Sequence, residues 1–241
     1  MLLERECAIK RMNSSRIAAK EARVLKYIYK KCPNAVEFID HIVYEDRHYI
    51  LMEYVHGINR RHLLDLTHRG IFMTEEEVAR IVYQIARTLE YLHDHEYVYG
   101  DVKPDNFIYV PPKSVCMIDF GCTRDGPALF TPVGTPIFFA PEKFQWNFGY
   151  ASDIWALGIM MYLLLSGIHP FAHQYRNKMD RYMLEHEICN NPLVFAHSKW
   201  DDVSKEAQDL LYCMLVKDPM KRITAKELLT HPWFSQDWKK K

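Results

Sequence analysis

The longest apolar run of the chain, residues 154–168, limits the fold more than any other feature of the sequence. The run has about 15 residues, whereas a helix needs about 20 apolar residues to span a bilayer. A helix that is apolar on every side is buried in a protein core. We therefore expect this segment to form a helix through the middle of a helical unit.

Composition and charge exclude several classes of function. The 241 residues suffice for one large domain or for two small lobes that share a cleft. Lys plus Arg and Asp plus Glu both number 31, so no global attraction to nucleic acid or to an anionic membrane follows. The N-terminus turns charged at Glu4 without the apolar core of a signal peptide, which predicts a soluble intracellular protein. The six scattered cysteines predict buried or half-buried thiols in a reducing compartment and no zinc site.

The first part of the chain is predicted to be rich in strands. Its expected elements are a strand over 7–12, a helix over 16–31 and strands over 36–43 and 48–54. Ser14 and Ser15 can cap the helix, and Pro33 ends it. The apolar side chains that recur at helical spacing in this helix are Ile17, Val24, Leu25 and Ile28.

From about Gly57 the pattern is mostly helical. Thr74 and Glu77 form a capping-box signature at the start of a helix that continues to Leu92. Short strands and loops follow over residues 97–121, and helical patterns resume after Pro141. The chain therefore predicts a small β-rich lobe followed by a larger helical lobe. A plain α+β domain without a cleft fits the same pattern.

Three polar clusters in the middle of the chain carry candidate chemistry. They are Y-G-D-V-K-P-D-N at 99–106, I-D-F-G at 118–121, and G-T-P at 134–136 followed by A-P-E at 140–142. Each one taken singly is an ordinary turn sequence. Their order and spacing along the chain carry more information than any one of them.

The order matches the protein-kinase signature, in which V-A-I-K, H-R-D-L-x-x-x-N, D-F-G and A-P-E follow one another. Here C-A-I-K at 7–10 precedes the three clusters, and the interval from Asp101 to Asn106 agrees. The chain resembles the catalytic domain of a eukaryotic Ser/Thr protein kinase over nearly all of residues 1–241. The resemblance implies an α+β, two-lobed protein-kinase fold in a single domain, with a partial small lobe over 1–55, a hinge over 53–57 and a large lobe over 58–241.

Other segments resemble the same family. Residues 153–158 are similar to the start of its buried central helix, and 221–224 with 231–234 are similar to its closing segment. Residues 162–167 and 170–171 favour the calcium/calmodulin-dependent group.

The resemblance implies ATP and Mg²⁺ as cofactors. Lys10 would hold the α- and β-phosphates of ATP and would be oriented by an ion pair with Glu21. Asn106 and Asp119 would bind Mg²⁺, a cation that prefers hard oxygen ligands. Phosphoryl transfer depends chiefly on such positioning and charge neutralisation.

The adenine base and the substrate hydroxyl also have expected partners. Met52 would guard the back of the adenine pocket, and Glu53 and Val55 would offer backbone hydrogen bonds to the base. Ala8 and Ile108 would lie on either side of the base.

Asp101 would accept or orient the proton of the substrate hydroxyl, and Lys103 would offset charge on the γ-phosphoryl group. Lys103 together with Thr135 is similar to Ser/Thr rather than Tyr kinases.

Further matches to the family are expected to be structural. Glu142 and Arg222 would form a buried ion pair, and Asp153 would cap the backbone of the segment that contains Asp101. An apolar column linking the lobes would consist of Leu25, Phe38, Tyr99 and Phe120.

The chain departs from the family pattern at its start. No glycine precedes Gly57, so the glycine-rich loop that covers the ATP phosphates is missing. Residues 1–3 are interpreted as the tail of its second strand. We expect a truncated chain or an incomplete gene model; the other interpretation is a protein without the loop and with weak or no ATP turnover.

The Asp101 cluster departs from the pattern too, because Tyr99-Gly100 replaces His-Arg. The family's arginine grips a phosphorylated activation loop. We therefore hypothesise that activity does not depend on a phosphate at Thr131. Asn59 replaces a Glu that basophilic relatives carry, which leaves Asp105 as one nearby carboxylate and only a weak preference for basic peptides.

The leading prediction is a monomeric, cytoplasmic kinase that acts on protein Ser/Thr hydroxyls, without a nucleic-acid partner or a membrane span. One alternative is a pseudokinase or scaffold with the kinase fold. The other is a small-molecule kinase, which would not be expected to carry the segment from G-T-P to A-P-E.

Overall fold

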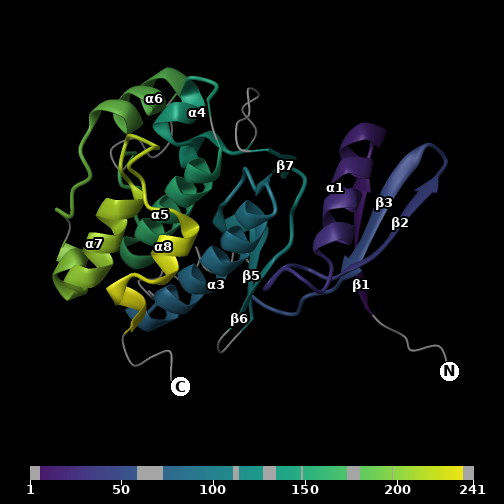
Figure 1. Cartoon of the computed structure of the whole chain (residues 1–241), viewed down its shortest axis with the longest axis horizontal. Helices are drawn as coiled ribbons and strands as arrows, with labels where there is room; N and C mark the ends of the chain where they lie inside the picture. The colour runs from purple at the N-terminus through teal and green to yellow at the C-terminus, as the bar shows by residue number, and fades with distance from the viewer. Residues whose placement is uncertain are drawn as a thin grey trace.

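The computed structural model describes residues 6–58, 73–110, 114–126, 134–147, 149–172, 180–196 and 198–235. Residues 1–3, Asn59 and Thr131, for which we had expectations, lie outside the described residues. Figure 1 shows a small strand-rich lobe beside a larger helical lobe. The predicted two-lobed α+β architecture is confirmed.

The small lobe is built on a three-stranded antiparallel sheet. Its strands are β1 (Cys7–Met12), β2 (Phe38–Tyr44) and β3 (Arg47–Glu53), and β3 lies in the middle. Glu45 and Asp46 form the two-residue turn between β2 and β3, and both have positive φ angles, of 47° and 58°. Two consecutive residues of this kind give the turn the twist that a tight hairpin requires. The helix α1 (Ser15–Ile28) lies against this sheet (Figure 1).

The helix α1 differs from its prediction in length and in its buried face. Ser14 caps it as expected, with its side chain accepting a hydrogen bond from Ile17 N, but the helix ends at Ile28 instead of residue 31. Ile17 is 47% exposed, whereas Ala18 and Glu21 are buried. Val24, Leu25 and Ile28 are buried as predicted. Only Ile17 was misplaced, because the buried face also includes Glu21, a charged residue whose carboxylate has a partner inside the protein.

The large lobe is built around two long helices, α3 (Glu75–Asp94) and α5 (Tyr150–Ser166). The predicted capping box at the start of α3 is confirmed, since Thr74 and Glu77 exchange hydrogen bonds. The predicted buried helix is α5, in which side chains on every side are shielded from solvent. Gly167 ends α5 with a φ angle of 76°, a conformation that favours glycine.

Shorter elements complete the large lobe. The strands are β4 (Tyr97–Val98), β5 (Phe107–Val110), β6 (Ser114–Met117) and β7 (Arg124–Asp125). The shorter helices are α4 (Pro141–Phe144), α6 (Arg181–Asn190), α7 (Lys205–Met214) and α8 (Ala225–Leu229). The 3₁₀ turns are η1 (Pro104–Asn106), η2 (Pro136–Phe138), η3 (Ser198–Asp202) and η4 (Pro232–Ser235). Strands β5 and β6 pair antiparallel, as do β4 and β7.

All six cysteines are free thiols. Five are buried or half-buried as predicted, but Cys7 is exposed. Cys7 lies on the outward-facing set of the alternating positions of β1, which explains the error. Within the described ranges, no helix is both long and apolar enough to cross a membrane.

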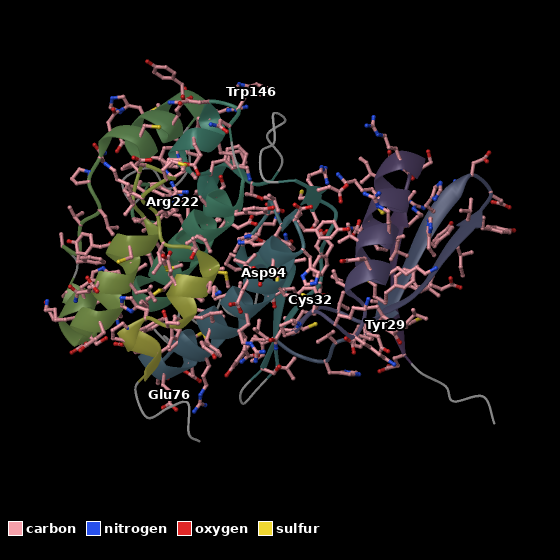
Figure 2. The ribbon with its side chains drawn as sticks, in the orientation of Figure 1. Tyr29, Cys32, Glu76, Asp94, Trp146 and Arg222 are labelled. Carbon is pink, nitrogen blue, oxygen red and sulfur yellow. The ribbon has the colours of Figure 1, made fainter. Side chains whose placement is uncertain are left out.

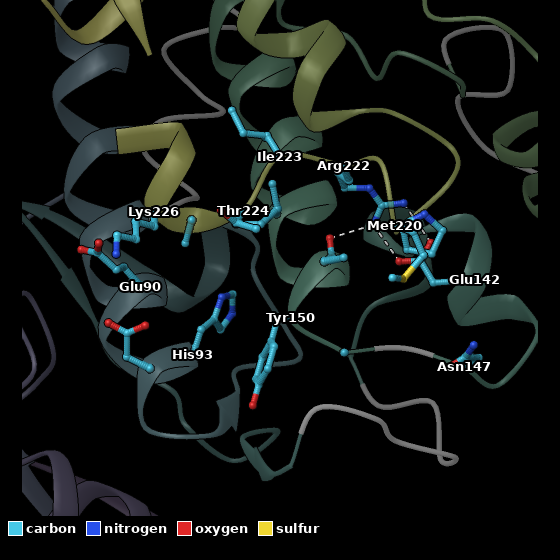
Figure 3. Close-up of a pocket in the computed structure, with 16 residues that line it drawn as sticks. Glu90, His93, Glu142, Asn147, Tyr150, Met220, Arg222, Ile223, Thr224 and Lys226 are labelled. Carbon is cyan, nitrogen blue, oxygen red and sulfur yellow. Dashed lines mark hydrogen bonds and ion pairs between the residues drawn. The ribbon is translucent and has the colours of Figure 1, made fainter. Parts of the chain in front are cut away.

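A buried ion pair joins α4 to the loop before α8. Arg222 donates from both guanidinium nitrogens to the carboxylate of Glu142, at 2.7 and 2.9 Å, and the Arg222 side chain is fully buried. Figure 2 places Arg222 among the helices of the large lobe, and Figure 3 shows Glu142 beside it. Arg222 also donates to the carbonyl of Ala151 at the start of α5. The predicted pair is therefore confirmed, and Arg222 also anchors the start of α5.

Arg222→Met is expected to lower the free energy of unfolding by about 3–5 kcal/mol, because it leaves Glu142 as a buried charge without its main partner. Denaturant titration followed by circular dichroism would measure the change. Lys221→Met is the matched control: its pair with Asp218 is exposed, and such pairs contribute roughly 0–1 kcal/mol. Equal unfolding midpoints for Arg222→Met and the parent would contradict this assignment.

Candidate active site

Lys10 joins three segments that are distant in the sequence. Its Nζ atom lies 2.7 and 2.9 Å from the two carboxylate oxygens of Glu21 and 2.8 Å from Oδ1 of Asp119. Lys10 is on β1, Glu21 is on α1, and Asp119 follows β6 in the large lobe. The predicted Lys10–Glu21 ion pair is present, and the same ammonium extends it to the D-F-G cluster.

The three charges change one another's proton affinity. Burial opposes the charged form of Lys10, but the charges of Glu21 and Asp119 outweigh it and raise the lysine pKa. Burial alone would raise the pKa of Asp119, but the hydrogen bond and charge of Lys10 hold that pKa below its usual value. Burial raises the pKa of Glu21 in spite of Lys10. Asp119 is thus an ionised carboxylate at neutral pH, suited to a cation.

Asp101 lies within a second cluster of donors. Its Oδ2 atom is 2.7 Å from Lys103 Nζ and accepts a hydrogen bond from Asn106 Nδ2 at 3.0 Å. Its Oδ1 atom accepts from the backbone N–H and the hydroxyl of Thr135, at 2.9 and 3.0 Å. Lys103 also donates to the Thr135 hydroxyl at 2.7 Å. These contacts fix the orientation of the Asp101 carboxylate.

The direct contact between Thr135 and Asp101 was not predicted. No local pattern predicts that G-T-P at 134–136 folds back onto residues 99–106, since the two segments are more than 25 residues apart. The family resemblance, which pairs Thr135 with Lys103, is the signal that could have indicated it.

Asn106 and Asp119 meet the requirements of a Mg²⁺ site. The Asn106 amide nitrogen donates to the Asp101 carbonyl and carboxylate, so its side-chain oxygen is the atom that can bind a cation. A backbone bond of 3.0 Å from Ile118 N to Asn106 O brings the residue before Asp119 against Asn106. Two hard oxygen donors therefore come from adjoining segments, and their chemistry fits Mg²⁺.

Asp153 caps the backbone of residues 99–106, as predicted. Its Oδ2 atom accepts from Tyr99 N and its Oδ1 atom from Gly100 N, both at 2.8 Å. His93 Nε2 lies 3.0 Å from the same carboxylate.

Tyr99 and Phe120 of the expected apolar column are buried with their rings 5.5 Å apart, edge to face. Leu25 is fully buried and Phe38 packs at the edge of the same core.

The residues expected around adenine lie on β1, on β3 and the segment after it, and on β5. Ala8 is directly opposite Met52 in the β1–β3 register. Glu53 donates its backbone N–H to Glu37 O at 3.0 Å, and Val55 follows it in the chain segment that leaves β3. Ile108 is on β5, opposite Cys116.

Gly57, in the segment predicted to be the hinge (53–57), lies against β5, a contact that was not predicted. A Cβ atom at position 57 would lie 2.5 Å from the Tyr109 carbonyl oxygen and 2.6 Å from a methyl carbon of Ile108. Ile58 and Tyr109 form an isolated antiparallel bridge beside it. Only glycine allows this approach of the two backbones, which places Ile108 near the hinge.

A cavity of about 670 Å³ lies elsewhere in the large lobe (Figure 3). Its lining includes His93, Tyr150, Met220 and Lys226, and the Glu142–Arg222 pair borders it. None of the predicted site residues lines it.

A cluster of Asp209, Cys213 and His231 has ligand atoms within 4.8 Å of one another. However, His231 Nδ1 accepts the Trp233 N–H at 3.2 Å, so Nε2 carries the proton and points it toward Asp209. A metal would need that Nε2 lone pair, so hydrogen bonding accounts for this cluster better than metal binding.

The fold has two lobes, and Lys10 of the small lobe is paired with Asp119 of D-F-G in the large lobe. Asp101 and Asn106 lie together in the large lobe. These features define a protein of the kinase class. The chain matches the protein kinase domain family over residues 3–234. It is 34% identical to ribosomal protein S6 kinase alpha-1 of Rattus norvegicus, over 96% of this chain and 32% of that protein. It is also 34% identical to the probable serine/threonine-protein kinase fhkB of Dictyostelium discoideum, over 93% of this chain and 19% of that protein.

The chain therefore belongs to the protein kinase family, as its motifs predicted. It spans about a third or less of the length of these relatives.

Lys10→Met is expected to raise the pKa of Asp119, because burial then acts on that carboxyl without the opposing lysine charge. Carbon-13 NMR titration of the carboxyls in metal-free buffer would measure the change, with Lys221→Met as the control. A carboxyl with a lowered folded-state pKa stabilises the fold above its unfolded pKa and loses that contribution as pH falls through the folded value. The parent should therefore lose more stability on acidification than Lys10→Met. An Asp119 pKa that is the same in both proteins would contradict the ion pair.

Proposed function

We propose that the chain transfers the γ-phosphoryl group of ATP to Ser or Thr hydroxyls of a protein substrate. The observation that supports this best is the ring of donors around Asp101, which holds a carboxylate where a hydroxyl can be oriented. Lys103 belongs to the same ring, and the Lys10–Glu21–Asp119 network lies across the lobes from it. The relatives carry kinase names, which supports the same activity.

In the proposed reaction, the substrate hydroxyl oxygen forms a bond to the γ-phosphorus. The bond from that phosphorus to the bridging oxygen of ADP breaks, and the hydroxyl proton passes to Asp101. Lys103 offsets negative charge on the group in transfer, and Lys10 holds the remaining phosphates. Mg²⁺ held by Asn106 and Asp119 would neutralise phosphate charge when it is bound. Met52, Glu53, Val55, Ala8 and Ile108 would contact the adenine.

Several finer features belong to the same proposal. The residues at 162–167 and 170–171 support a likeness to the calcium/calmodulin-dependent group. The balanced charge and scattered thiols support a cytoplasmic monomer that acts on protein rather than on nucleic acid. Residues 1–241 would form one domain with its hinge over 53–57.

Asp101→Asn is expected to lower kcat for a Ser/Thr peptide by roughly 10²–10⁴-fold, the range for loss of a positioned acid–base group. Asp119→Asn should abolish transfer, because it removes a carboxylate ligand of Mg²⁺. The assay follows labelled ATP and Mg²⁺ with a mixed peptide set, beside Lys221→Met as an active control. If the parent transfers no phosphate, the scaffold alternative is favoured instead. If the parent and Asp101→Asn are equally active, the proposed role of Asp101 is wrong.

Thr131→Ala is expected to keep kcat within about twofold of the parent, because Gly100 provides no guanidinium to grip a phosphate there. The same peptide assay measures this. Loss of activity in Thr131→Ala with recovery in Thr131→Glu would show that a negative charge at this position is needed.

A further inference from the structure

Lys143 is a buried cation beside the proposed catalytic residues that the mechanism does not yet use. It lies on α4, directly after Glu142, and is only 5% exposed. Its Nζ atom donates to the carbonyl oxygen of Gly100 at 2.7 Å and lies 4.6 Å from the centre of the Phe139 ring. The ammonium thus reaches the peptide bond that connects Gly100 to Asp101.

Fold stability does not account for a lysine at this position. Removing an ammonium from water is costly, and apolar residues of similar volume often replace buried ionic groups without loss of stability. Burial lowers the pKa of Lys143, although the carboxylates of Asp153, Asp101 and Glu142 and the thiol of Cys122 act against that shift. A methionine would fill the same space without this desolvation cost, although the Gly100 carbonyl would lose one donor. The positive charge of Lys143 is therefore explained by what it does to the groups around it.

Those neighbours converge on the backbone next to Asp101. Gly100 is held at both ends, since its N–H donates to Asp153 on α5 and its carbonyl accepts from Lys143 on α4. A point beside Gly134, where a Cβ would be, lies 2.5 Å from Gly100 O, 3.0 Å from Asp101 Oδ1 and 3.4 Å from Lys143 Nζ. Four segments of the large lobe therefore meet around Gly100.

The backbone at this point needs to be held from outside. Gly100 has a φ angle of 86° and Gly134 one of 100°, conformations that glycine adopts without strain but does not enforce. The kinase signature has an arginine at the position of Gly100. In this chain the cation that contacts the peptide bond between Gly100 and Asp101 comes from a different segment, the helix α4, which begins within A-P-E.

We propose that Lys143 is a positioning residue of the phosphotransfer site, whose ammonium fixes the Gly100 carbonyl and thereby the orientation of Asp101. This inference rests on the proposed function. The ammonium of Lys143 needs no modification of the chain. It therefore holds the segment that carries Asp101 without a phosphate on the activation loop. Lys143 also connects α4, at the end of the segment from G-T-P to A-P-E, to the peptide bond before Asp101.

Lys143→Met tests the proposal, with Lys221→Met as a matched control on the surface. Lys143→Met is expected to lower kcat for a peptide by roughly 10–100-fold, because small displacements of a reacting group cost that much. KM for ATP should stay close to that of the parent, and the melting temperature should fall by a few degrees at most, because one buried carbonyl loses a donor. The carboxylates near Lys143 keep other donors, Asp101 from Lys103 and Asp153 from Tyr99. Amide hydrogen exchange at Tyr99 and Gly100 should become faster, while the rest of the large lobe keeps its protection.

Three outcomes would overturn the proposal. One is an unchanged kcat in Lys143→Met. Another is a loss of folding, or a fall in melting temperature with faster exchange throughout the lobe, because either indicates a purely structural role. The third involves Lys143→Arg, which keeps the charge and the N–H donors and should retain several-fold more activity than Lys143→Met. Equal activity of these two variants would exclude the charge as the cause.

The exchange measurement also separates this proposal from the proposed function. If the parent transfers no phosphate, the proposed function fails. Faster exchange confined to Tyr99 and Gly100 in Lys143→Met would still support the positioning role, and unchanged exchange there would overturn it.

Discussion

The whole arrangement depends on how one buried carboxylate, that of Asp153, holds an irregular stretch of backbone. Residues 99–106 have no long strand or helix to satisfy their N–H groups, and a buried N–H without a partner is costly. Asp153 accepts two of these N–H groups and is itself fixed on the central helix α5. The buried central helix of the large lobe thus sets the position of the segment that carries Asp101.

The buried and half-buried charges of this protein join segments that are distant in the sequence. Lys10 connects β1 to α1 and to the D-F-G cluster, and Arg222 connects α4 to the start of α5. In each case an apolar pair would pack as well, but it would not specify the direction of a carboxylate. Geometry of this kind is what phosphoryl transfer requires, because the protein supplies position and charge rather than covalent chemistry.

The elements and the candidate residues could be predicted from the sequence because they are marked by local patterns and by the order of the motifs. Helix caps such as Thr74 and the apolar run of α5 are local signals, and the motif residues stand in a fixed order. The errors came where a contact joins distant segments. Ile17 was placed on the buried face because the pattern did not show that Glu21 would be buried against Lys10. The contact of Thr135 with Asp101 and the burial of Lys143 depend on how the chain folds back, which no local pattern records.

The close approach at Gly57 has a consequence for motion between the lobes. The backbone after this glycine is bridged to β5, so it moves with the large lobe. The end of β3 at Glu53 moves with the sheet of the small lobe. The segment before β2 is also bridged to the large lobe, through Ala35 and Met117. A rotation of one lobe against the other would therefore bend the chain at two places, before β2 and over residues 54–56. The second of these includes Val55, one of the residues proposed to contact the adenine base.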